Sequence, residues 1–186
     1  MSSLFNIFAD LFYKVGFSPS TLSFVGLAFS LLSAYLYYTA SFKLEKIYLA
    51  AFFLLVSGFF DAVDGALARK YKRVTRFGGV LDSTLDRIGE IMVYFGVIAG
   101  RLSSLEIGLI ALSFSLMVSY SRARAEMEGL NLSGVGLVER PERLIILVLA
   151  SFLNKIQAGM VIIALASVLT TIQRVFYAYK KLKGKV

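Results

Sequence analysis

The sequence contains no cysteine and no histidine. The absence of cysteine excludes disulfides, thiolate nucleophiles and zinc or iron–sulfur sites built on cysteine. The absence of histidine excludes imidazole acid–base catalysis and the ligation of haem or zinc by histidine. If the chain is an enzyme, its chemistry must rest on Asp, Glu, Lys, Arg or Tyr side chains.

Charged residues are also scarce. They make up only 17% of the 186 residues, whereas soluble domains carry about 25%. Hydrophobic residues make up 58%, and the mean hydropathy is +0.74. Most of the surface therefore cannot face water, and no polar linker divides the chain. We expect a single domain over residues 1–186 that is embedded in a lipid bilayer.

Six apolar stretches predict an all-α bundle of six transmembrane helices over residues 17–182. A helix needs about 20 apolar residues to cross a bilayer, and the fifth stretch reaches that length only with residues from both flanks. Before the bundle, apolar residues spaced by three and four over residues 1–16 predict an amphipathic helix at the membrane interface. The predicted spans are residues 19–40, 47–68, 79–100, 105–125, 144–153 and 156–179.

The net charge of +8 is unevenly placed along this predicted topology. Of the 20 Lys and Arg residues, 15 fall on the side of the membrane that holds the N-terminus, four fall on the other side, and Arg87 lies within a span. The positive-inside rule then places both termini in the cytoplasm of a multi-pass cell-membrane protein. Because the basic residues lie between apolar stretches, we expect contacts with membrane lipids and none with nucleic acid.

Four aspartates interrupt the second and third predicted spans: Asp61, Asp64, Asp82 and Asp86. A carboxylate at a helix centre costs about 2.5–3.5 kcal/mol on insertion scales. Residues three or four apart share a helix face, and a short connection makes the two helices antiparallel neighbours. Four like charges at one depth repel one another unless cations intervene. Ligands that offer only oxygen favour a hard cation such as Mg²⁺, and four carboxylates suit two ions.

Small residues flank the aspartates. Gly65, Ala68 and Gly78 leave room for a ligand, and Arg69 can hold a phosphate through two hydrogen bonds. The alternative is that the aspartates form ordinary salt bridges with the basic connection. That alternative suits one aspartate better than four on two adjacent helix faces.

The spacing of these residues resembles the signature of the CDP-alcohol phosphotransferase family, DxxDGxxARx8GxxxDxxxD. Residues 61–69 are DAVDGALAR and residues 78–86 are GGVLDSTLD, so every fixed position is present. The resemblance implies a homodimeric membrane enzyme of six helices. Such an enzyme transfers a phosphoryl-linked alcohol group from a CDP-alcohol to a second alcohol and releases CMP.

The resemblance also implies roles for individual residues. Asp61, Asp64 and Asp82 would bind the first metal ion, and Asp86 would complete the second and act as the catalytic base. Mg²⁺ is the expected ion, with Mn²⁺ as a substitute. The family more often has Pro-Asn where this chain has Pro19-Ser20. The implied CDP-binding residues are Ser18, Pro19, Ser20, Thr21, Gly65, Ala68, Arg69, Thr75 and Gly78.

Arginines in the second half of the chain indicate the acceptor. Arg122, Arg124 and Arg174 lie inside or at the margins of predicted helices, where arginine needs an anionic partner. Several arginines near the metal site would bind a second phosphate, which implies an acceptor that is itself a phosphomonoester. The plain alternative is positive-inside topology together with contacts to lipid headgroups.

The segments ARAE, ERPERL and QR are similar to those of the phosphatidylinositol-phosphate synthase branch of the family. This similarity implies inositol 1-phosphate as acceptor and CDP-diacylglycerol or CDP-archaeol as donor. The implied phosphate ligands are Arg122, Arg124, Arg140, Arg143 and Arg174.

Four alternatives remain at this point. Two lie within the family: a transferase that joins CDP-inositol to inositol phosphate, and a phosphatidylglycerophosphate synthase. An ion or proton transporter predicts acids spread across the bilayer depth, whereas these acids crowd at one side. A nonenzymatic assembly protein would not require the aspartates at all.

Overall fold

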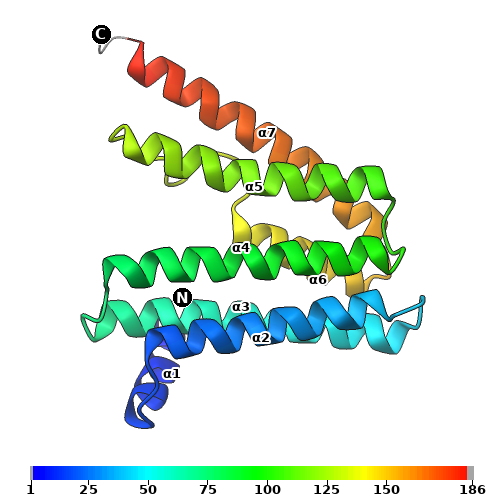
Figure 1. The fold of residues 1–186 in the computed structure, drawn as a ribbon, viewed down its shortest axis with the longest axis horizontal. Helices are drawn as coiled ribbons and strands as arrows, with labels where there is room; N and C mark the ends of the chain where they lie inside the picture. Colours follow the sequence, from blue (N-terminus) through cyan, green and yellow to red (C-terminus); the bar gives the residue numbers. More distant parts are fainter. Residues whose placement is uncertain (1, 184–186) are drawn as a thin grey trace. The chain divides into compact units, whose positions relative to one another are not determined.

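The computed structural model describes residues 2–183, and over this range the chain is helical without any strand. The predicted all-α class is therefore confirmed. The helices, coloured along the chain in Figure 1, are α1 (Ser2–Lys14), α2 (Pro19–Tyr38), α3 (Leu44–Lys70), α4 (Arg76–Ala99), α5 (Leu105–Met127), α6 (Arg140–Phe152) and α7 (Ile156–Leu182).

The helices form two compact units. The N-terminal unit comprises residues 1–100, with α1 to α4, and the C-terminal unit comprises residues 101–186, with α5 to α7. Each unit has its own internal packing.

Four of the six predicted spans are matched by helices that are long and apolar enough to cross a membrane, namely α2, α3, α5 and α7. The other two differ for separate reasons. Helix α4 has 24 residues, but it is not apolar enough for a membrane span by composition. Its charged residues include Asp82, Asp86, Arg87 and Glu90. Helix α6 has 13 residues, and a helix of that length is about 20 Å long, whereas the hydrocarbon core is about 30 Å thick.

In the N-terminal unit, α2 packs against both α3 and α4. Small residues allow the close approach, as is common between membrane helices. A Cβ added at Gly96 or Gly100 would collide with the main chain of Ala34 or Tyr37 on α2. Between α2 and α3, the buried hydroxyls of Ser30 and Ser57 are 2.7 Å apart. Helix α2 therefore sets the position of both helices that carry the aspartates.

Helix α1 packs against α3 through aromatic side chains. Phe8 meets Phe59 edge to face with ring centroids 4.9 Å apart, and the rings of Phe12 and Phe60 are 5.8 Å apart. Helix α1 thus buries aromatic side chains against α3.

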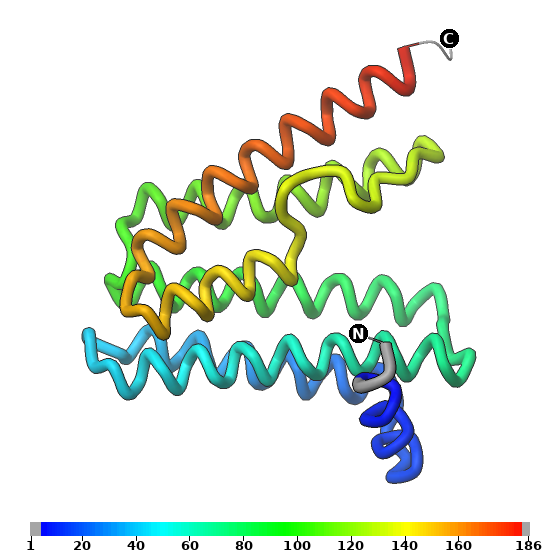
Figure 2. The backbone as a smooth tube through the Cα atoms, turned by 180° about the vertical axis from the view of Figure 1, so that it is seen from behind, coloured from blue at the N-terminus to red at the C-terminus, as the bar shows by residue number. Residues whose placement is uncertain are grey.

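In the C-terminal unit, α7 packs against both α5 and α6. The long connection between α5 and α6 is yellow-green to yellow in Figure 2, and Thr170 of α7 holds it through hydrogen bonds. Its hydroxyl oxygen accepts hydrogen bonds from the main-chain N–H groups of Leu137 and Val138, at 3.0 and 3.1 Å. Gly136 precedes them with φ +120°, and a Cβ there would collide with the Thr170 methyl.

Candidate active site

Three of the four predicted metal ligands come together in the N-terminal unit. Asp61 and Asp64 on α3 and Asp82 on α4 each offer a carboxylate oxygen, and these three oxygens lie within 4.8 Å of one another. Asp64 is 4% exposed, and the other two are half-buried. The structure therefore gathers like charges into a small volume.

The local sequence explains how these side chains meet. Asp61 and Asp64 are three residues apart, so they lie on one face of α3. The chain leaves α3 at Tyr71 and begins α4 after Thr75, whose hydroxyl oxygen accepts a hydrogen bond from the Gly78 N–H at 2.9 Å. This N-cap fixes the start of α4, and Asp82 lies less than two turns further along that helix.

The donor set fits a divalent metal ion. All three side chains are carboxylates, and hard cations such as Mg²⁺ and Mn²⁺ prefer oxygen ligands. A cation between them would also relieve the mutual repulsion that favours protonation of clustered acids. The residues placed to hold it are Asp61, Asp64 and Asp82.

Asp86 lies one turn beyond Asp82 on α4 and is not a member of this group of carboxylates. Its Oδ2 is 3.8 Å from Arg87 Nη2. Arg87 Nη1 is in turn 3.5 Å from an oxygen of Glu90, a residue that is only 9% exposed. Sequence reasoning missed Glu90, although its spacing of four from Asp86 continues the acidic face of α4.

Ser23 was also not predicted from the sequence as part of the site. This residue lies on α2, and its hydroxyl donates a hydrogen bond to Asp64 Oδ2 at 2.7 Å. Helix α2 is therefore the third helix that contacts the group of clustered aspartates, although it contributes no carboxylate to that group.

The predicted CDP-binding residues occupy the starts of α2 and α4 and the end of α3. Ser18 caps α2, with its hydroxyl oxygen 2.8 Å from that of Thr21, and Pro19 and Ser20 open the first turn. At the end of α3, a Cβ added at Gly65 would lie 3.1 Å from Arg69 Nη1. Because Gly65 has no side chain, the Arg69 guanidinium can lie close to the backbone at that position. Ala68 is the next residue on the same side of the helix.

Beyond Arg69, the end of α3 is tied to α1. Asp10 accepts hydrogen bonds from Lys70 Nζ at 2.7 Å and from the Tyr71 hydroxyl at 2.6 Å. The hydrogen bond from Lys70, and after it the one from Tyr71, lowers the pKa of Asp10 below its usual 3.8. The hydrogen bond to Asp10 raises the pKa of Tyr71 to about 12. Tyr13 stacks on Tyr71 at 3.7 Å, and the Arg73 guanidinium lies 5.0 Å from the Tyr13 ring.

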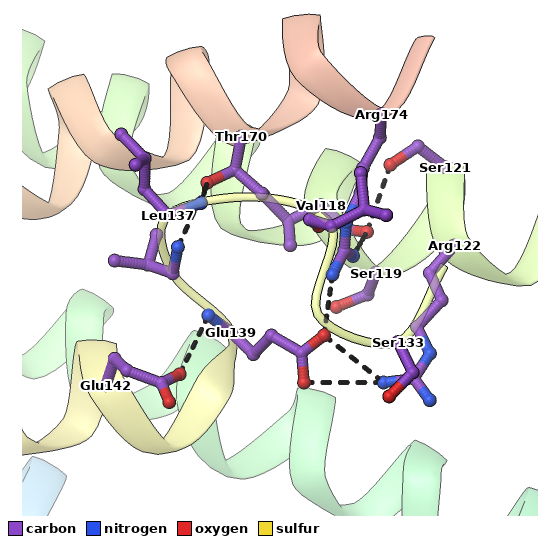
Figure 3. A network of polar contacts seen from close by, with 12 residues as sticks. Val118, Ser119, Ser121, Arg122, Ser133, Leu137, Glu139, Glu142, Thr170 and Arg174 are labelled. Carbon is purple, nitrogen blue, oxygen red and sulfur yellow. Dashed lines mark hydrogen bonds and ion pairs between the residues drawn. The ribbon is translucent and has the colours of Figure 1, made fainter. Parts of the chain in front are cut away.

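The arginines predicted to hold the acceptor phosphate belong to the C-terminal unit, where Glu139 gathers two of them. Arg174 is 1% exposed, and its Nη2 donates to Glu139 Oε1 at 2.7 Å. Arg122 Nη1 lies 3.4 Å from Oε2 and 3.5 Å from Oε1 of the same carboxylate (Figure 3). Arg174 also donates to the carbonyl oxygens of Val135 at 2.8 Å and Val118 at 2.6 Å.

The other three arginines lie differently. Arg124 Nη1 is 2.5 Å from Glu128 Oε1, one turn along the exposed side of α5. Arg140 opens α6, and Arg143, one turn later, is 1% exposed. Sequence reasoning also missed Glu139 as the partner of Arg122 and Arg174. The available signal was the pair of acids, Glu139 and Glu142, within an arginine-rich segment.

Comparison with known proteins identifies the family of this chain. The sequence profile of the family described as CDP-alcohol phosphatidyltransferase matches residues 17–179, which include the aspartates and the arginines. The chain therefore belongs to the CDP-alcohol phosphatidyltransferase family. It is a transferase of phospholipid biosynthesis, and the family acts on a CDP-linked lipid donor and an alcohol acceptor.

The chain is similar to the archaetidylinositol phosphate synthase of Pyrococcus horikoshii, with 41% identity over 170 residues that cover 91% of this chain and 88% of the relative. Two crystal structures of the phosphatidylinositol phosphate synthase of Mycobacterium tuberculosis have a similar fold at 32% identity. The one with CDP-DAG bound has a TM-score of 0.79 and covers 94% of this chain and 93% of that chain. The one with manganese and citrate has a TM-score of 0.82 and covers 94% and 88%.

Proposed function

We propose that this enzyme transfers the phosphatidyl-type group of CDP-diacylglycerol or CDP-archaeol to inositol 1-phosphate. The products are CMP and a lipid-linked inositol phosphate. The proposal rests above all on the carboxylate group of Asp61, Asp64 and Asp82, which occupies the metal-binding positions of the family signature. The names of the similar synthases, archaetidylinositol and phosphatidylinositol phosphate synthase, support the acceptor.

The proposed reaction joins the acceptor hydroxyl oxygen to the lipid-side phosphorus of the diphosphate and breaks the bond from that phosphorus to CMP. Two divalent ions, held by Asp61, Asp64 and Asp82 with Asp86 completing the second site, would neutralise the diphosphate and stabilise departing CMP. Asp86 accepts the proton of the attacking hydroxyl, because a carboxylate can serve as general base in a chain without histidine.

Residues around the acids orient the donor. Arg69 holds a phosphate of the CDP group through its guanidinium, and Gly65 gives that guanidinium its space. The helix starts at Ser18 and Thr75 present main-chain N–H groups, which favour anions. The remaining CDP contacts are those that the family signature implies.

The acceptor phosphate is bound by arginines of the C-terminal unit. Arg122 and Arg174 both lie against Glu139, so the fold holds two guanidiniums at one point and fixes their orientation. Arg124, Arg140 and Arg143 complete the proposed set. Guanidinium groups suit this task because they bind phosphate bidentately.

We also propose that the protein crosses the cell membrane six times, with both termini and the active site at the cytoplasmic side, and that it forms a homodimer. Three apolar side chains are more than half exposed: Ile7 and Leu11 on α1, and Val15 just after it. Exposed apolar side chains suit a helix that lies at the membrane interface. Helix α6 crosses only if flanking residues extend it. Light scattering on the purified protein in detergent tests the dimer.

The decisive experiment is CMP release by the purified protein in detergent with Mg²⁺. CDP-diacylglycerol and CDP-archaeol serve as donors, and inositol 1-phosphate, glycerol 3-phosphate, free inositol and serine are offered in turn. We expect CMP release with inositol 1-phosphate and its loss on chelation of the metal. Faster release with glycerol 3-phosphate, or reaction of CDP-inositol in place of the CDP-lipid, would instead support one of the two alternative activities of the family.

A further inference from the structure

The side chain of Ser23, on α2, contacts the group of clustered aspartates. Its hydroxyl donates to Asp64 Oδ2 at 2.7 Å, and Asp64 is the most buried of the three clustered aspartates. We propose that Ser23 is a positioning residue, which orients the Asp64 carboxylate so that it can bind the divalent ion. This inference rests on the metal site of the proposed function.

The hydroxyl has a choice of acceptor, and the distances favour the carboxylate. Ser23 Oγ lies 3.2 Å from the Pro19 carbonyl oxygen, four residues earlier in α2, and 2.7 Å from Asp64 Oδ2. A hydroxyl has a single proton, and hydrogen bonds to a charged acceptor are shorter and stronger than neutral ones. An ionised carboxylate has about four lone-pair sites, so Asp64 can accept from Ser23 and still ligate a cation.

Helix packing, rather than the serine alone, fixes this contact. Seven residues further along α2, Ser30 meets Ser57, which lies seven residues before Asp64 on α3. The two contacts therefore belong to one antiparallel seam. Between them, at Gly26, the helices are close, because a Cβ added there would be in van der Waals contact with the Ser57 carbonyl oxygen at 3.4 Å.

The same seam supplies a matched control. Ser23 and Ser30 both bridge α2 and α3 through a hydroxyl at 2.7 Å, but only Ser23 bonds to a carboxylate. A purely structural role predicts that removing either hydroxyl weakens the fold and leaves metal affinity alone. A positioning role predicts a loss of metal affinity at Ser23 only, because partners that orient a ligand tune its binding of the metal.

The experiment measures Mn²⁺ binding by the full chain in detergent, without lipid or nucleotide, from the paramagnetic resonance signal of free Mn²⁺. We expect Ser23→Ala to weaken Mn²⁺ binding by about tenfold, within the range found for residues that support metal ligands. Ser30→Ala should bind Mn²⁺ like the wild type. Thermal unfolding without metal, followed by circular dichroism, should show similar losses for both variants.

Further outcomes separate this inference from the metal site itself. Unchanged Mn²⁺ affinity in Ser23→Ala, or an equal loss in Ser30→Ala, overturns the role of Ser23 while the metal site stands. A wild-type protein that binds no Mn²⁺ overturns the proposed site. If Ser23→Ala does not fold, Ser23→Cys keeps the volume with a weaker donor and should also bind Mn²⁺ less tightly, whereas wild-type affinity in that variant contradicts the inference.

Discussion

Residues 1–100 hold three carboxylates whose oxygens lie within 4.8 Å of one another, whereas residues 101–186 bury the guanidinium of Arg174 against two carbonyl oxygens and Glu139. In the first unit the fold brings like charges together, and in the second it brings opposite charges together. Like charges destabilise the fold until a cation joins them, while the arginine is stabilised by partners from its own unit. If the proposed metal site is correct, the N-terminal unit loses stability without metal and regains it when the ion binds.

The largest expected effect comes from Asp82→Asn, which neutralises one of the three clustered carboxylates. CMP release should fall by at least about a hundredfold, because losing a metal ligand removes several kcal/mol of transition-state stabilisation. The unfolding temperature without metal should rise, because the repulsion weakens.

Thermal unfolding by circular dichroism, with and without Mn²⁺, measures both sides of this prediction. Metal at a hundred times its Kd stabilises a protein by about 2.7 kcal/mol, and Asp82→Asn should lose most of that gain. The exposed neighbour Ser83, changed to Ala, is the control. A variant that keeps both full CMP release and the full stabilisation by metal would contradict the comparison.

The next effect concerns the C-terminal unit. Arg174→Met keeps most of the side-chain volume but leaves the carbonyl oxygens of Val135 and Val118 without their donor. We expect a loss of about 3 kcal/mol in unfolding free energy, as for other buried hydrogen-bonded charges. Arg124→Met removes an exposed ion pair with Glu128, and it should cost less than about 1 kcal/mol. Equal losses in the two variants would show that Arg174 does not stabilise this unit as the contacts indicate.

The smallest effect is a pH dependence at the exposed junction of α1 and α3. The pKa of Tyr71 is raised from 10.0 to about 12, so the neutral hydroxyl is the form that the fold favours. Its contribution is fully present below pH 10 and is lost as the pH rises toward 12. Tyr71→Phe should therefore lose less stability than the wild type over this window in thermal unfolding, and parallel curves would refute the prediction.

At acid pH, Asp10 should give a stability change of the opposite sign: its contribution to folding is lost as the pH falls. Its folded-state pKa lies below 3.8 because Lys70 and Tyr71 donate to the ionised carboxylate. The stabilisation is thus present above pH 3.8 and disappears as the pH falls through the folded-state value. The Asp10→Asn variant lacks this contribution, and its unfolding temperature should fall less steeply than that of the wild type on acidification.

Local spacing predicted much of the site. Asp61 and Asp64 share a helix face because they are three residues apart, and the predicted span from residue 19 begins where α2 begins. The contact of Ser23 with Asp64 was not predictable, because the residues are 41 positions apart and a helical serine can equally bond to the carbonyl four residues earlier. Glu139 was missed because its neighbours Arg122 and Arg174 come from two different helices.

The sequence by itself determined that the chain is helical, apolar enough for a membrane and a member of its family, because composition and short-range periodicity carry that information. Tertiary structure alone decided which helix supports the carboxylates and which acid holds the arginines. Those contacts depend on how each helix is rotated about its axis and how closely small residues let helices approach. Neither quantity is encoded in the spacing of residues along one helix.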